Sequence, residues 1–109
     1  MALDMSSLGR LIASARKAQE LSQKQLAELV VKEDGAPITP QYLNDIEHDR
    51  RSPSSDHIMH QFAKVLKIPA DRLFAVAGVL PEDARKMVKK STPEKVDKAL
   101  VAFRKAFKD

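Results

Sequence analysis

Short segments in which apolar residues recur at spacings of three and four dominate this sequence and restrict what it can fold into. Such spacing places the apolar side chains on one face of an α-helix, whereas a half-buried β-strand requires strict alternation. Val30-Val31 is a single, weak strand signal. The three glycines and six prolines are placed as turn or boundary signals along the chain. The pattern therefore predicts an all-α protein.

Five of these segments lie within residues 1–80, and each follows a recognisable helix start. Such starts are favoured where Ser or Thr can accept a backbone hydrogen bond, or where proline occupies the first helical position. The expected start signals are Ser6 or Ser7, the capping-box pattern Ser22 to Gln25, Thr39-Pro40, Ser54 and Pro69. The apolar residues that we expect to face inward are Leu8, Leu11, Ile12, Ala15, Leu26, Leu29, Val30, Leu43, Ile46, Ile58, Phe62, Val65, Leu66, Leu73 and Val76. The third helix should cover Thr39–Asp49, and Gly78 should cap the fifth.

Residues 81–109 carry two further helical signals. The first begins at Pro81-Glu82-Asp83 and ends with Lys89-Lys90, a charge order that the helix dipole favours. The second begins at Thr92-Pro93, and its apolar seam consists of Val96, Leu100, Phe103 and Phe107. A chain of 109 residues has room for one compact domain and a short extension. We therefore divide it into a domain of residues 1–80 and a helical extension of residues 81–109.

The net charge of +4 is unevenly distributed along the chain. Residues 1–80 contain ten Lys or Arg and ten Asp or Glu, so the main domain is neutral. Residues 81–109 contain nine basic and five acidic residues, which accounts for the whole excess. The basic character of the protein is therefore no evidence that its main domain binds nucleic acid.

Several function classes lack support in the sequence. The three separated glycines form neither a phosphate-binding loop nor a nucleophile elbow, and the adjacent Glu33-Asp34 pair suits acid–base chemistry poorly. His57 and His60 lie three apart but lack a convincing third ligand. We therefore expect no catalytic residue, no cofactor and no metal, and we interpret the chain as something other than an enzyme.

The sequence contains no cysteine, and no apolar run approaches the roughly 18–20 residues that cross a bilayer. Its first residues lack the basic and apolar regions of a secretion signal. We expect a cytoplasmic, nucleoid-associated protein without a membrane partner.

A set of residues in a fixed order points to one family. The set comprises Arg16, Ser22-Gln23, Leu26-Ala27, Leu43, Ile46, Glu47, Arg50-Arg51-Ser52-Pro53-Ser54 and Phe62-Ala63-Lys64-Val65-Leu66. Through these residues the chain, from Leu8 to Gly78, resembles the Xre/Cro-type, lambda-repressor-like helix-turn-helix transcriptional regulators. The resemblance implies a five-helix lambda-repressor-like DNA-binding domain, here followed by a helical C-terminal extension, with double-stranded DNA as its partner.

The third helix is the expected reader of bases. A helix in the major groove must bury one face against its own domain and offer the other to base edges. Leu43 and Ile46 form the inward face, and the outer face carries Pro40, Gln41, Asn44 and Asp45. Gln and Asn can pair with adenine through two hydrogen bonds, and Asp can accept one from cytosine. The alternative is that these side chains are merely solvated.

Other residues are expected to hold the DNA backbone or the domain itself. Gln23 resembles the family's phosphate contact at the start of the second helix, where helix N-termini favour anions. His48, Arg50 and Arg51 follow the third helix and are candidate phosphate contacts. Tyr42 either packs between helices or lies against a sugar-phosphate strand. The resemblance further implies that Arg16 and Glu47 form a structural ion pair between the first and third helices.

The chain departs from the family in two places. About six extra residues lie between Val31 and Ile38, and segment 32–37 is either a solvent loop or a contact for a partner. The apolar seam of residues 93–108 can fold back on its own domain or pair with a second copy, and the Lys and Arg residues around it can instead lie along phosphates. We favour pairing, because a dimer doubles the readout of short half-sites.

These features lead to one main function hypothesis and two alternatives. The main one is a sequence-specific transcriptional repressor that acts as a homodimer. The first alternative is an antitoxin-like protein whose tail, residues 93–108, binds a partner protein while the domain represses its own operon. The second is a module that bridges transcription proteins without reading bases.

Overall fold

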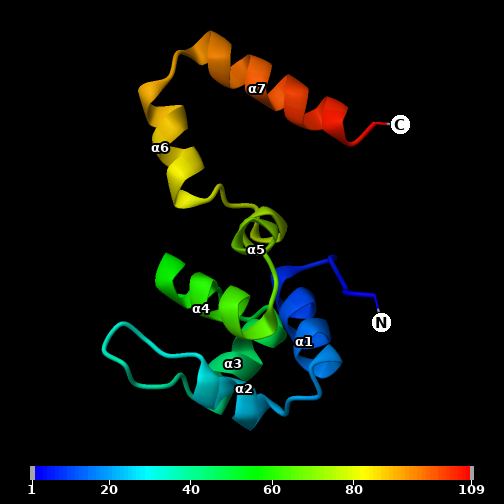
Figure 1. The fold of residues 1–109 in the computed structure, drawn as a ribbon, viewed down its shortest axis with the longest axis vertical. Helices are drawn as coiled ribbons and strands as arrows, with labels where there is room; N and C mark the ends of the chain where they lie inside the picture. Colours follow the sequence, from blue (N-terminus) through cyan, green and yellow to red (C-terminus); the bar gives the residue numbers. More distant parts are fainter. Residues whose placement is uncertain (1, 109) are drawn as a thin grey trace. The chain divides into compact units, whose positions relative to one another are not determined.

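The computed structural model describes residues 2–108, which contain seven α-helices and, apart from one isolated β-bridge, no β-structure (Figure 1). The helices are α1 (Leu8–Ala18), α2 (Gln23–Leu29), α3 (Pro40–Glu47), α4 (Asp56–Leu66), α5 (Ala70–Ala77), α6 (Glu82–Lys90) and α7 (Pro93–Ala106). The predicted all-α class is confirmed. The contacts divide the chain into two units, residues 1–79 and 80–109, which are described separately.

Local start signals explain most of the helix boundaries. Ser7 caps α1 by accepting a hydrogen bond from the Arg10 backbone N–H, and Ser22 forms a complete capping box with Gln25. Thr39 accepts from the Tyr42 N–H, with Pro40 at the first position of α3. Gly78 ends α5 in a left-handed conformation with φ +77°. Each such cap contributes typically ~1 kcal/mol.

Two predicted boundaries are wrong. The cap of α4 is Ser55 rather than Ser54, because Ser55 accepts from the Ile58 N–H while the Ser54 N–H donates to the Tyr42 hydroxyl. Helix α3 ends at Glu47 rather than Asp49, because Asp49 takes a left-handed conformation with φ +58°.

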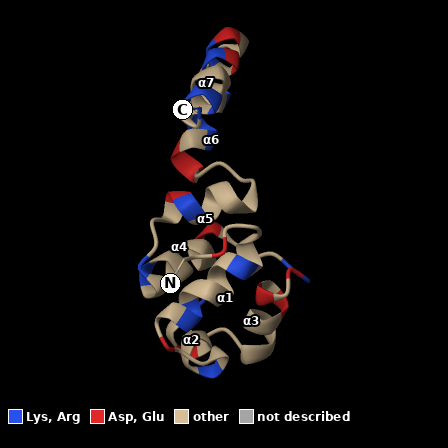
Figure 2. Cartoon of the chain, turned by 90° about the vertical axis from the view of Figure 1, so that its right-hand side faces the viewer, with Lys and Arg blue, Asp and Glu red and all other residues tan. Residues whose placement is uncertain are grey.

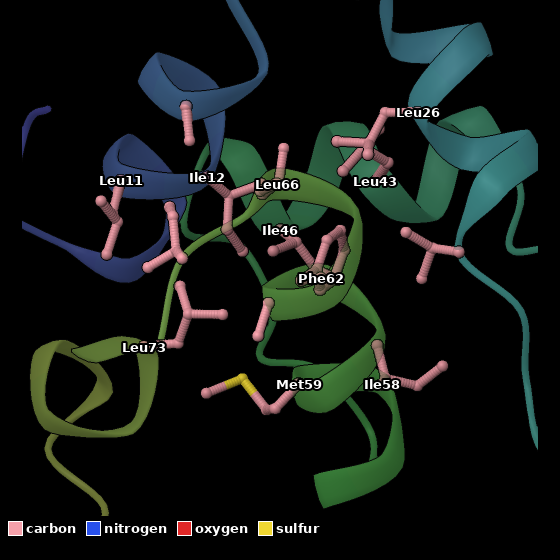
Figure 3. Packing of buried hydrophobic residues seen from close by; sticks show 14 of the residues in the cluster. Leu11, Ile12, Leu26, Leu43, Ile46, Ile58, Met59, Phe62, Leu66 and Leu73 are labelled. Carbon is pink, nitrogen blue, oxygen red and sulfur yellow. The ribbon is translucent and has the colours of Figure 1, made fainter. Parts of the chain in front are cut away.

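One apolar cluster holds the first unit together (Figure 3). Its fully buried large side chains are Leu11, Ile12, Leu26, Val30, Leu43, Ile46, Ile58, Phe62, Leu73 and Phe74. Figure 3 shows side chains from α1, α3, α4 and α5 converging on this cluster. Burying each large side chain contributes roughly 1.5–3 kcal/mol. Leu29 was expected in the core but is 51% exposed, because Leu26 and Val30 already occupy the inward face of the short α2.

The extra segment between α2 and α3 folds back on itself instead of forming an open loop. Val31 and Pro37 form an isolated antiparallel bridge, and the Lys32 N–H donates to the Ala36 carbonyl over 2.8 Å. The excursion, which extends away from the helices in Figure 1, is fixed to α4 at both polar groups of Val31. The Val31 N–H donates to Gln61 Oε1 over 3.3 Å, and His57 Nε2 lies 2.9 Å from the Val31 carbonyl oxygen. The insertion therefore closes without separating α2 from α3, which remain packed together.

The second unit contains α6 and α7, and neither helix has a buried residue. Thr92 caps α7 by accepting a hydrogen bond from the Lys95 N–H, and Pro93 occupies the first helical position. The exposed large apolar side chains of the second unit are Leu80, Met87, Val88, Leu100, Val101, Phe103 and Phe107. Within residues 2–108, none of the helices has the length and apolar character that crossing a bilayer requires.

Candidate nucleic-acid interface

Helix α3 is anchored on one side and open on the other. Leu43 is 0% exposed and Ile46 is 1% exposed, and both belong to the core cluster. On the opposite side Gln41 is exposed, whereas Asn44 and Asp45 are partly exposed. The helix therefore has the two-faced form that groove insertion requires.

Arg16 of α1 and Glu47 of α3 form a two-pronged ion pair. Arg16 Nε donates to Glu47 Oε2 over 2.7 Å, and Arg16 Nη2 donates to Glu47 Oε1 over 3.0 Å. The two side chains are 11% and 3% exposed, and Arg16 Nη1 also donates to the Leu21 carbonyl over 2.8 Å. The ion pair therefore connects α1 with α3 and, through Leu21, with the segment just before α2, and both charged side chains are largely shielded from solvent.

Gln23 continues this polar network toward the outer face of α3. Its Nε2 donates to Glu47 Oε1 over 3.0 Å, and its Oε1 accepts from Asn44 Nδ2 over 3.3 Å. Both ends of the Gln23 amide are therefore engaged inside the protein. As the first residue of α2, Gln23 retains a backbone N–H with no partner within the helix, which is suited to an anion.

The Arg50 side chain folds back onto α3 and donates hydrogen bonds to two of its residues. Arg50 Nη2 donates to Asn44 Oδ1 over 2.6 Å, and Arg50 Nε donates to Asp45 Oδ1 over 3.1 Å. The same Asp45 oxygen accepts from Gln41 Nε2 over 3.0 Å. Three of the four candidate base readers, Gln41, Asn44 and Asp45, therefore share one hydrogen-bonded network, and substitutions among them are expected to be non-additive.

Tyr42, Arg51 and His48 flank this network. The Arg51 guanidinium lies 4.6 Å from the centre of the Tyr42 ring, a cation–π distance. The Tyr42 hydroxyl accepts from the Ser54 N–H over 2.8 Å, and the ring packs against the core. His48 is exposed, with Nδ1 2.9 Å from the Asn44 carbonyl oxygen. Tyr42 therefore has a packing role, and the face of its ring lies against the Arg51 guanidinium.

The sequence that forms most of α1 to α5 matches a known family. A family model described as helix-turn-helix matches residues 12–73. The chain belongs to this family. The resemblance inferred from the sequence is thereby confirmed.

Two curated relatives of this helix-turn-helix protein come from Mycobacterium tuberculosis, one from strain CDC 1551 / Oshkosh and one from strain H37Rv. Both are named as uncharacterised HTH-type transcriptional regulators. Each is 35% identical over 72 residues, which is 66% of this chain and 46% of the relative. The chain therefore spans about half the length of these relatives. No solved structure matches it significantly.

Gly9 and Asp49 form a contact between α1 and the end of α3 in the first unit, and the sequence analysis did not predict it. The Asp49 carboxylate accepts from the Gly9 N–H over 3.0 Å and from the Ser7 hydroxyl over 2.7 Å, so it binds the N-terminus of α1. A Cβ at Gly9 would meet the Ile46 carbonyl and lie 2.6 Å from the Glu47 carbonyl oxygen. The contact is therefore close enough to exclude any side chain. A glycine near the start of a helix was the available signal, since glycine there is otherwise unfavourable.

The first unit carries charges of both signs, and its neighbouring histidines His57 and His60 both make contacts within the protein. Figure 2 shows acidic and basic residues interspersed over α1 to α5, without one dominant basic face. His57 contacts the Val31 carbonyl, and the His60 ring lies 5.5 Å from the Phe74 ring. Among residues 2–108, no group of three or more His, Cys, Asp or Glu side chains is placed to hold a metal ion.

Proposed function

We propose that this protein is a sequence-specific regulator of transcription that binds double-stranded DNA and represses as a homodimer. One observation carries the proposal: α3 is anchored through Leu43 and Ile46 while its polar face remains accessible. The names of the two relatives, which call them HTH-type transcriptional regulators, support the same class.

In this proposal α3 reads bases from its first turns. Pro40 contacts the apolar edge of a base, and Gln41 and Asn44 offer to adenine the amide hydrogens and oxygen lone pairs that their partners within the protein leave unused. Asp45 accepts from a cytosine amino group through the oxygen that Arg50 and Gln41 leave open. Each good two-pronged pair contributes roughly 1–3 kcal/mol of discrimination against the wrong base.

The surrounding residues fix the protein on the DNA backbone. The free backbone N–H of Gln23 contacts one phosphate. Arg51, positioned by the Tyr42 ring, and His48 contact others, and Arg50 contributes the donors that Asn44 and Asp45 do not use. Such contacts provide affinity and register but carry no sequence information.

Repression follows from occupancy of an operator by two copies. Two helix-turn-helix domains on one face of DNA read half-sites about 34 Å apart, which doubles the length of sequence that is read. A bound dimer that overlaps a promoter excludes polymerase.

The test is selection of bound fragments from random DNA by the purified full chain, followed by binding measurements with variants. We expect one enriched palindromic sequence. Gln41→Ala should relax the preference at one base pair, whereas Arg51→Ala should weaken all sites alike. Lys64→Ala, an exposed change on α4, serves as the control and should leave binding unchanged. No enriched sequence, or equal and uniform losses for Gln41→Ala and Arg51→Ala, would refute the proposed base reading.

A second candidate is an antitoxin-like function, favoured by the absence of buried residues in α6 and α7. The tail, residues 93–108, would then cover a partner protein while the first unit binds the operator. This candidate requires a gene for a small toxic protein beside this one and a stable complex on co-expression. A genome without such a neighbour argues against it.

A further inference from the structure

Helix α7 exposes much of an apolar strip and contains no fully buried residue. Leu100 is 48% exposed, Phe103 57% and Phe107 74%, and Val96 lies on the same strip. Because each residue advances by roughly 100° around a helix, the four side chains fall within a band about 60° wide. Steps of four, three and four are the spacing of a coiled-coil seam.

The two flanks of the strip differ in chemistry. Asp97 and Arg104, seven residues apart, follow one edge of the strip. Ala99 and Ala106, also seven residues apart, follow the other edge. One flank is therefore charged with both signs, and the other is small enough for a second helix to approach closely.

We propose that α7 pairs with α7 of a second copy in the antiparallel direction. A two-fold axis then places Leu100 opposite Phe103 of the second copy and Val96 opposite its Phe107. The same axis places Asp97 beside Arg104 of the second copy, and the pair occurs twice because a two-fold interface is self-complementary. The proposal deepens the dimeric function proposed above and rests on it.

Charge selects the antiparallel direction over the parallel one. Residues 93–99 contain two acidic and two basic side chains, whereas residues 102–108 contain three basic and no acidic ones. Parallel pairing would bring the two basic ends together and would place Asp97 beside an alanine flank. Antiparallel pairing places each basic end beside an end with equal numbers of acidic and basic residues. It also gives Asp97 and Arg104 partners of opposite charge.

Helix α6 extends the apolar surface. A groove of about 390 Å³ within the second unit is lined by apolar side chains of both helices, among them Leu80, Met87, Val88 and Val96. Helix α7 is about 21 Å long, roughly two heptads, which is short for a coiled coil by itself. The α6 side chains provide the additional apolar area that a stable dimer requires.

The test measures the oligomeric state of the full chain without DNA by sedimentation over a range of concentrations. We expect a dimer for the natural sequence. Asp97→Arg or Arg104→Asp alone replaces two attractive pairs with two repulsive ones and should raise the dimer Kd roughly tenfold. The double variant restores opposite charges in exchanged positions and should recover the original Kd, and an equimolar mixture of the two single variants should form a heterodimer.

Lys105→Asp is the matched control, because it changes the same charge on the opposite side of α7 and should leave the Kd nearly unchanged. Circular dichroism verifies that each variant keeps its helical content. A natural chain that is monomeric at all concentrations overturns the proposal. So does a double variant that remains as weak as the single variants.

The outcome is independent of the proposed DNA binding. If the chain selects a DNA sequence but sediments as a monomer without DNA, the α7 pairing fails and the regulator function survives. If the chain is dimeric with the expected charge dependence but selects no DNA sequence, the pairing survives and the proposed function fails.

Discussion

Replacing Arg16 with methionine should destabilise the protein strongly, because Arg16 is the cation of a largely buried ion pair. The substitution removes the cation from a carboxylate that is 3% exposed, and Glu47 then keeps one side-chain donor, Gln23 Nε2. Removing one partner of a buried ion pair costs roughly 3–5 kcal/mol. For a domain of this size such a loss lowers the Tm by roughly 12 °C or more.

Removing both partners should cost less than removing one. In the variant Arg16→Met with Glu47→Met no buried charge remains, and two apolar side chains of similar volume fill the space. The remaining losses are the donors to the Leu21 carbonyl and the acceptor of the Gln23 amide. We therefore expect the double variant to be more stable than Arg16→Met.

Urea unfolding followed by circular dichroism measures the free energy of unfolding of the natural chain, Arg16→Met, Glu47→Met and the double variant, and the double-mutant cycle gives the coupling energy. Arg10→Met is the matched control, because Arg10 lies on the same helix with its side chain 68% exposed, and the change should have almost no effect. A loss below about 1 kcal/mol for Arg16→Met, or strictly additive effects in the cycle, would refute the interpretation of a buried, coupled pair.

Three further substitutions test the backbone features of the first unit by thermal unfolding. Gly9→Ala should destabilise the protein by roughly 2–3 kcal/mol, because the added methyl group would overpack against backbone carbonyls, and this cost outweighs the gain in helix propensity. An unchanged Tm would show that α1 and α3 can move apart at no cost. Lys67→Gly should stabilise by about 0.5–1 kcal/mol, since Lys67 has φ +59°; a lower Tm would contradict this reasoning. Asp49→Gly relieves the same kind of strain at φ +58° but loses two hydrogen bonds to α1, so it should destabilise by about 1 kcal/mol, and a rise in Tm would show that these bonds are weak.

Local sequence signals predicted much of the fold. Caps at Ser7, Ser22 and Thr39 depend on the residues that follow within three positions, so they are visible in the sequence. The start of α4 was misplaced by one residue because Ser54 and Ser55 both satisfy the local rule. The choice between them depends on Tyr42, twelve residues earlier in the chain, which accepts from the Ser54 N–H.

The features that sequence reasoning missed are long-range. The closure of the insertion depends on His57 and Gln61, which lie 26 and 30 residues from Val31. The role of Gly9 depends on Asp49, 40 residues away. Periodicity and capping carry no information about such contacts, so they required the packed structure.

The polar network and the charge distribution bear on the proposed dimer, because they limit the affinity that one copy of the first unit would have for DNA. Residues 1–80 carry no net charge, and the charges of Arg16 and Arg50 are balanced within the protein by Glu47 and Asp45. Non-specific affinity for DNA grows with the number of phosphates that free cations neutralise. Since few of the proposed phosphate contacts are free cations, one unit would obtain much of its affinity from a short set of base contacts. Two linked units raise that affinity because the second binding event becomes intramolecular, and they do so without new cations. Under the proposed function, the neutrality of the first unit and the proposed pairing of α7 therefore complement each other.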